Sequence, residues 1–197
     1  MNLDQITEPL NQRLARGLAR IAAVARQLNW QAAEVAGLSP TQADILGFIA
    51  NRPEGVRLTK VAAHAGVSKA TASEAVAAME RKGLVRKYAD ASDGRALALT
   101  ATAEGRRIIQ AWPSGFAPIV AGLSQAEQEA LFGLVVKMIR QLQQRQMIAP
   151  QRVCATCRYF RENVAPGTTT PHFCAFVGAP MAGRHLRVDC AEHESAA

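Results

Sequence analysis

The sequence predicts a mainly α-helical protein with a short β-hairpin and a small cysteine-rich tail. Three observations support this fold class. Apolar residues recur at intervals of three and four through much of residues 1–149. The interval changes to two in a short stretch after Gly83. All four cysteines lie within the last 44 of the 197 residues, and at 49% hydrophobic and 20% charged residues the chain can form a folded core.

A long amphipathic helix is expected within residues 1–37. Its apolar stripe begins at Leu3, and Gly37 supplies the stop signal. A second helix should follow at once, because Ser39 is a favourable N-cap, Pro40 suits the first helical position and Gln42 completes a capping box. The stripe of the first helix has no obvious partner within so short a region.

Two further helices are joined by a tight turn at Gly66. The first begins near Thr59, and the second is capped by Ser68 and stops at Gly83. A short helix, a tight turn and a longer helix are the helix-turn-helix pattern. The second helix should bury Ala72, Ala75, Val76 and Met79. Its exposed N-terminal half carries the candidate base-contacting residues Ser68, Lys69, Thr71, Ser73 and Glu74.

A β-hairpin is expected directly after this helix. The stretches LVRKYA and ALALT alternate as strands do, and Asp93-Gly94 is a turn signal between them that places Arg95 near the tip. A helix-turn-helix followed by a basic hairpin forms a winged helix, which we assign to residues 38–110. A helix of this kind fits the major groove of DNA, and an arginine on the wing suits the minor groove.

The distribution of charge agrees with a polyanionic partner such as double-stranded DNA. The net charge is +7, and residues 52–107 hold 11 basic and 6 acidic side chains. Four of the basic residues cluster at the end of the second helix and on the first strand, where phosphate contacts are expected. They are Arg81, Lys82, Arg86 and Lys87. An ordinary solvated surface would also account for this charge.

The segment from LSPTQADIL through LTKVAAHAGVSKATASEAVAAMERKG to the wing resembles the MarR family of transcription regulators. The resemblance covers roughly residues 5–147. It implies a homodimer that binds a palindromic operator, usually as a repressor. It also implies that Asp93 orders the wing, that Arg95 enters the minor groove, and that Lys69, Thr71 and Ser73 lie at contact positions.

The sequence departs from the usual pattern of that family at Glu74 and Ala78, where many members carry arginine. Base preference therefore does not carry over. Glu74 has two possible roles: it can accept a hydrogen bond from a cytosine amino group, or it can hold a neighbouring basic side chain. We favour the second role.

Residues 111–149 are expected to form further helices, with Ser124 and Glu127 as a capping box before a long one. That helix has its own apolar stripe, from Leu131 to Leu142. A single winged helix is too small to cover two such stripes, so the natural solution is dimerisation through the N- and C-terminal helices. Packing of the two helices against each other in a monomer is the alternative.

Pro150 marks the start of a tail, residues 150–197, with little regular pattern. Its cysteines are Cys154, Cys157, Cys174 and Cys190, in the spacing C-x2-C-x16-C-x15-C. In a reducing cytoplasm such a set is expected to bind metal, either zinc or an iron–sulfur cluster, and a segment this short needs a bound centre to organise it. His172, His185 and His193 lie nearby in sequence and are expected to be surface residues or to support the ligands.

Two features favour a cluster. Aromatic residues flank the thiols, as suits a centre shielded from solvent. In addition, CATCRYF, CAFVG and the late fourth cysteine resemble high-potential iron–sulfur proteins, which implies a [4Fe–4S] cluster held by four cysteines. Asp189 stands where those proteins usually carry an aromatic residue. Zinc remains the alternative, and a [2Fe–2S] cluster or disulfides remain possible as well.

The sequence contains no pairing of nucleophile and base, no paired catalytic carboxylates and no phosphate-binding loop, so we do not expect an enzyme. No signal peptide or membrane span is expected, which predicts a cytoplasmic protein. We therefore expect a DNA-binding regulator that responds to redox or iron state. The alternatives are a regulator with a small-molecule effector and a structural zinc, or an electron carrier.

Overall fold

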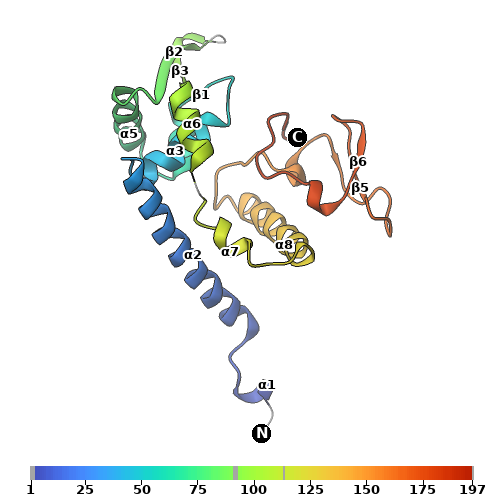
Figure 1. Cartoon of the computed structure of the whole chain (residues 1–197). Coiled ribbons are helices and arrows are strands. Elements are labelled where there is room, and N and C mark those ends of the chain that lie inside the picture. Colours follow the sequence, from blue (N-terminus) through green and yellow to red (C-terminus); the bar gives the residue numbers. More distant parts are fainter. Residues whose placement is uncertain (1–2, 91–92, 113, 197) are drawn as a thin grey trace.

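The computed structural model describes residues 3–90, 93–112 and 114–196. Figure 1 shows three parts: a winged helix, a long helix that runs away from it, and a tail that lies beside the last long helix. Within the described residues, no helix is both long and apolar enough to cross a membrane.

The N-terminal segment forms two helices where one was expected. Helix α1 covers Leu3–Ile6 and helix α2 covers Leu10–Val35, with Pro9 as the N-cap residue of α2. A proline ring clashes with the preceding helical turn and disfavours helical geometry at the residue before it, so the helix breaks at Glu8-Pro9. The stop at Gly37 is confirmed, with the left-handed φ of 64° that favours glycine.

The helices of the winged helix follow the expected order. They are α3 (Pro40–Ala50), α4 (Leu58–Ala65) and α5 (Lys69–Arg81). The capping box of Ser39 with Gln42 and the cap by Ser68 are confirmed. Helix α4 begins one residue before the predicted cap Thr59, because the N-cap is Arg57 at the end of a short strand.

The wing is part of a three-stranded antiparallel sheet in the order β1-β3-β2. Its strands are β1 (Val56–Arg57), β2 (Val85–Asp90) and β3 (Asp93–Ala101). No sequence pattern predicted the two-residue strand β1. The predicted turn at Asp93-Gly94 is wrong in position, since β3 begins at Asp93 and pairs it with Asp90. Residues 91–92 lie outside the described residues.

The core of the winged helix joins α3, α4 and α5 to the sheet. Its largest fully buried members include Ile45, Leu46, Ile49, Val61, Val76, Met79, Val85 and Leu99. Helix α6 (Ala103–Ala111) closes this core at Gly105, where a Cβ atom would meet the Leu84 carbonyl oxygen at 2.2 Å. Only glycine allows α6 to lie so close to the start of β2.

Apolar stripes on the two long helices remain uncovered in the single chain. Leu14 on α2 is 57% exposed, and Leu134 on α8 (Gln125–Gln144) is 59% exposed. The predicted capping box of Ser124 with Glu127 is confirmed at the start of α8. A short helix, α7 (Ala117–Val120), precedes it. The two stripes do not cover each other, which argues against the monomeric alternative.

The tail contains more regular structure than expected. It has two 3₁₀ turns, η1 (Cys154–Thr156) and η2 (Gly183–His185), and a three-stranded antiparallel sheet. The strands are β4 (Phe160–Arg161), β5 (His172–Cys174) and β6 (Ala179–Met181), in the order β4-β5-β6. Both 3₁₀ turns pack against α8. Val153, at the start of the tail, is fully buried.

The close approach at Gly105 leads to the first prediction. Gly105→Ala should destabilise the fold by about 1–3 kcal/mol, because the new methyl group collides with a backbone carbonyl that cannot move aside. Gly47→Ala is the matched control, since its Cβ would meet nothing within 4 Å and alanine favours a helix. Urea unfolding at one fixed protein concentration measures both; equal midpoints for the two variants would contradict the prediction.

Candidate DNA interface and thiol site

Helix α5 presents a polar face to solvent. Ala72, Val76 and Met79 anchor its other face in the core. The Oγ of Ser68 accepts a hydrogen bond from the Thr71 backbone N–H at 3.1 Å. The residues that the sequence predicted on this face are all exposed, namely Ser68, Lys69, Thr71, Ser73 and Glu74. The structure thus brings these five candidates together on one accessible surface.

Glu74 does not hold a neighbouring basic side chain. Among the residues that the structure describes, no ion pair or hydrogen bond is formed by its carboxylate, which points into solvent. The role that the sequence favoured for Glu74 is therefore not seen in the free chain. Its other predicted role, as an acceptor for a base, stays open.

The four basic candidates after α5 are exposed, but three of them already have partners. Lys82 Nζ donates to the Gly37 carbonyl oxygen at 2.5 Å, which ties the end of α5 to the loop after α2. Lys87 forms an ion pair with Glu80 at 2.7 Å. Arg86 Nε donates to Thr100 Oγ1 at 3.3 Å. Lys82 thus has a structural role that its sequence position did not suggest.

Asp93 and Arg95 belong to strand β3, and their side chains lie outside the described residues. The predicted roles of Asp93 in ordering the wing and of Arg95 in a groove therefore stay predictions.

The four cysteines line one cavity of about 370 Å³ in the tail. Cys154 and Cys157 flank η1, Cys174 ends β5, and Cys190 lies in the last segment. They come from positions up to 36 residues apart in sequence, and no disulfide joins them. The remaining wall is mostly apolar and includes Tyr159, Phe160, Phe176, Val177, Pro180 and Met181. Of the four aromatic residues that flank the thiols in sequence, Tyr159, Phe160 and Phe176 line this cavity and Phe173 does not.

Arg187 contacts two of the sulfur atoms. Its backbone N–H donates to Cys154 Sγ at 3.2 Å, and its guanidinium lies 3.7 Å from Cys190 Sγ. Burial raises the pKa of the Cys154 thiol, while the Arg187 N–H lowers it and the other three cysteines raise it further. Burial therefore disfavours the thiolate form of Cys154, and a bound cationic centre would offset that effect.

The four thiols are the donor set of either a single zinc ion or an iron–sulfur cluster. A tetrahedral zinc site holds its four sulfur atoms about 2.3 Å from one point. In the described part of the chain, however, no three histidine, cysteine, aspartate or glutamate side chains are grouped closely enough to hold one metal ion. The thiols instead surround a volume with room for several atoms. A [4Fe–4S] cluster fits such an arrangement, since each cysteine then binds a different iron.

The three histidines of the tail are engaged in hydrogen bonds. His172 Nδ1 accepts from the Asn163 N–H and His185 Nδ1 from the Ala182 N–H, each at 3.1 Å. His193 Nε2 lies 3.1 Å from Thr156 Oγ1. These contacts support the expectation that the histidines are not needed as ligands.

A second cavity, of about 450 Å³, lies between α2, the winged helix and the tail. Its wall carries Phe48, His64, Trp112, Asn29 and Arg52, a mixture of aromatic and polar groups suited to a small organic molecule. A small-molecule effector was one of the alternatives open from the sequence, but no sequence pattern indicated these residues.

Fold and surface together define a winged helix-turn-helix protein. The family model described as MarR family matches residues 36–96. The transcriptional regulator HosA of Escherichia coli O157:H7 is 37% identical over 114 residues, which cover 56% of this chain and 83% of HosA. The chain belongs to the MarR family of transcriptional regulators.

Solved structures agree with the fold. MepR of S. aureus, solved in its DNA-binding conformation, is 25% identical with a TM-score of 0.54, covering 68% of this chain and 99% of that one. CouR from Rhodococcus jostii RHA1, solved with p-coumaroyl-CoA bound, is 24% identical with a TM-score of 0.56, covering 70% of this chain and 94% of that one.

The Lys82 contact leads to the second prediction. Lys82→Met should lower the free energy of unfolding by about 1 kcal/mol, because the Gly37 carbonyl loses its donor. Arg81→Met, the adjacent control, should change it by no more than about 0.5 kcal/mol. Urea unfolding without DNA separates this structural role from any phosphate contact. Equal loss in both variants would show that the Lys82 bond contributes nothing specific.

Proposed function

We propose that this chain is a dimeric, sequence-specific DNA-binding regulator that acts as a repressor. Its C-terminal four-cysteine centre adjusts its affinity for DNA. The observation that carries the proposal is the combination of an exposed polar recognition face on α5 with four thiols gathered around one cavity in the same chain. Each part alone would support a simpler function.

The DNA-binding part rests on shape and charge. An α-helix fits the major groove, and the polar N-terminal half of α5 is the region that contacts base edges in helix-turn-helix proteins. MepR, a structural relative, was solved in a DNA-binding conformation. The exposed stripes on α2 and α8 supply a surface for a second copy, whose α5 would then address a half-site about 10 base pairs away.

The cofactor that we propose is a [4Fe–4S] cluster held by Cys154, Cys157, Cys174 and Cys190. Support comes from the four thiols that line one cavity, from the size of that cavity and from its mostly apolar wall. When bound, the cluster would supply a centre that gains or loses an electron, or decays in oxidant. Arg187 would donate hydrogen bonds to two ligand sulfurs, a contact that stabilises the thiolate form.

A second candidate function keeps the regulator but changes the signal. The 450 Å³ cavity beside Phe48 and Trp112 favours a small-molecule effector, with zinc as a structural centre in the tail. The two candidates differ in the metal and in whether its removal changes DNA affinity.

Metal content decides between them and is the third prediction. The protein purified without oxygen should be brown, with about four iron atoms per chain, and it should lose both iron and colour in Cys174→Ser. Air oxidation should change the operator affinity of the wild type at least tenfold, measured by gel shift. A colourless protein with one zinc per chain would contradict the iron–sulfur cluster. An iron-loaded protein whose operator affinity does not change on oxidation would contradict its role in sensing.

The recognition surface gives the fourth prediction. Charge reversal of Lys69 and Arg95 together should weaken operator binding at least tenfold and flatten the dependence of affinity on salt, because phosphate and groove contacts are lost. Reversal of Arg13 and Arg20 on α2 makes the same change in net charge and should have little effect, since this end of α2 runs away from the winged helix (Figure 1). If both pairs of charge reversals lost operator affinity equally, the effect would come from net charge and not from contacts of Lys69 and Arg95.

A further inference from the structure

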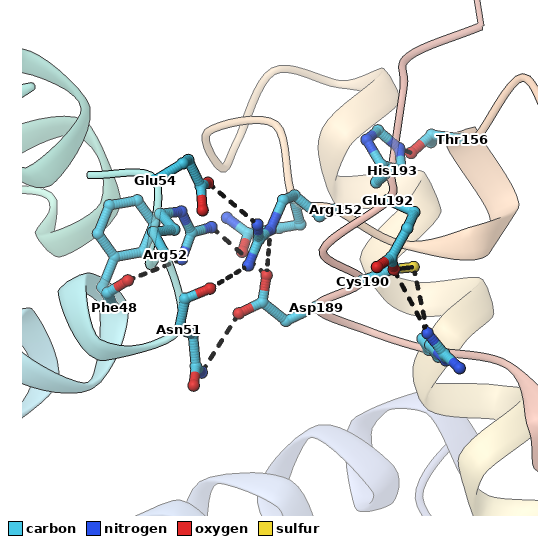
Figure 2. Close-up of polar contacts among 12 residues, drawn as sticks. Phe48, Asn51, Arg52, Glu54, Arg152, Thr156, Asp189, Cys190, Glu192 and His193 are labelled. Carbon is cyan, nitrogen blue, oxygen red and sulfur yellow. Dashed lines mark hydrogen bonds and ion pairs between the residues drawn. The ribbon is translucent and has the colours of Figure 1, made fainter. Parts of the chain in front are cut away.

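The carboxylate of Asp189 lies at the centre of the contacts between the tail and the winged helix. Figure 2 shows this residue between the two parts of the chain. Its Oδ1 accepts from Arg152 Nε at 2.6 Å and from Arg52 Nη2 at 3.4 Å, while its Oδ2 accepts from Asn51 Nδ2 at 3.3 Å. Asp189 thus contacts Asn51 and Arg52, which lie more than 130 positions before it in the sequence.

On the tail side, this contact is built from the chain neighbours of two thiols. Asp189 immediately precedes Cys190, and Arg152 lies two residues before Cys154. The backbone N–H of Cys190 donates to the Arg152 carbonyl at 2.9 Å, and that of Cys154 donates to the Arg187 carbonyl at 3.0 Å. The two segments are therefore held together as a pair. The segments that carry Cys154 and Cys190 thus also position Arg152 and Asp189.

On the winged-helix side, the contact grips the turn between α3 and β1. Arg152 Nη2 donates to the Asn51 carbonyl at 2.8 Å, at the C-cap of α3. Arg52 Nη1 donates to the Phe48 carbonyl at 2.9 Å, and its guanidinium lies 3.6 Å from the centre of the Phe48 ring. This turn leads directly into β1, which pairs with the wing strand β3.

The same contact reaches the helix-turn-helix. The Phe48 ring stacks on His64 of α4 with ring centroids 4.0 Å apart, and His64 Nε2 lies 3.3 Å from Asp44. Helix α4 packs on α5. A continuous series of contacts therefore runs from Cys190 through Asp189, Arg52 and Phe48 to the helix that supports the recognition helix.

Electrostatics makes Asp189 indispensable to this arrangement. The side chains of Arg52 and Arg152 are only 12% and 16% exposed, and both guanidinium groups contact Asp189 Oδ1. Burial is the largest influence on Arg52 and lowers the pKa of its guanidinium, Asp189 opposes this, and Arg152 adds to it. Glu54, 3.7 Å from Arg152, is the other acid present, so two acids balance two partly buried cations. Without Asp189, the repulsion between Arg52 and Arg152 is no longer balanced at this position.

We propose that Asp189, Arg152 and Arg52 form a clasp through which the state of the thiol centre sets the position of the winged helix. The inference rests on the proposed function and names its regulatory link. With the centre intact, Cys154 and Cys190 are fixed and the clasp holds the α3–β1 turn. With the centre lost, the two segments separate, the clasp opens, and the winged helix is freed from its attachment to the tail.

The test compares operator affinity with the centre loaded and stripped, in wild type and in variants. In Asp189→Asn the ratio of the two affinities should fall from at least tenfold to within twofold, while iron content and visible spectrum stay as in wild type, because Asp189 is not a ligand. Arg140→Met is the matched control: Arg140 also ties the tail to a helix, through Glu162 at 3.1 Å, but it does not touch the winged helix. It should keep the wild-type ratio.

A second variant shows whether the result in Asp189→Asn comes from misfolding caused by an unbalanced buried charge. Asp189→Asn with Arg152→Gln removes one acid and one base, so no unbalanced cation remains, and the ratio should collapse as in the single variant. Hydrogen exchange gives an independent reading. Amides of residues 51–57 should exchange faster in stripped than in loaded wild type, and equally fast in both forms of the double variant.

The outcomes separate the clasp from the function itself. Clasp variants that carry the full iron content and keep the wild-type affinity ratio would overturn the clasp alone. A wild-type ratio near one, in protein that carries iron, would overturn regulation by the centre as well as the clasp.

Discussion

The packing of α5 against α3 and α4 is the constraint on which the rest of the structure depends. Burial of Ala72, Val76 and Met79 fixes the rotation of α5 about its axis, so its polar side has to face outward. On an isolated helix these polar side chains could face any direction, whereas the packed core fixes which of them form the exposed surface of α5. The same core receives Leu99 from the wing strand, and therefore one hydrophobic cluster positions both the helix and the wing.

The tail follows a different principle. It has few buried apolar residues, and its four thiols face a shared cavity rather than a packed centre. Burial disfavours the Cys154 thiolate, and the proposed cationic centre would remove that penalty. Under the proposed function the tail would depend on what it binds, whereas the winged helix has its own apolar core. A chemical signal could then act on one part and leave the other folded.

Charge links the two parts. Arg52 belongs to the winged helix and Arg152 to the tail, and both are largely buried against one carboxylate. A pair of buried cations tolerates only a narrow geometry, because any displacement of the acid leaves them facing each other. An interface of this kind is sensitive to small movements in a way that an apolar contact of similar size is not. The contacts of Asp189 with both arginines give an acidic residue a physical role at this position.

The sequence by itself determined the local elements, because caps, periodicity and turn residues act over a few positions. Three helix starts were marked correctly by their capping residues: Ser39 with Gln42, Ser68, and Ser124 with Glu127. The helix break at Pro9 was also readable from the sequence, but the continuous apolar stripe suggested one unbroken helix. The four cysteines were identifiable as a set from their spacing. Only the tertiary structure decided that Asp189 meets Arg52, that Lys82 caps the Gly37 carbonyl, and that the short strand β1 joins the wing. These contacts join positions 41 to 137 residues apart, and no local pattern specifies them because they exist only once the core and the tail have been placed in space.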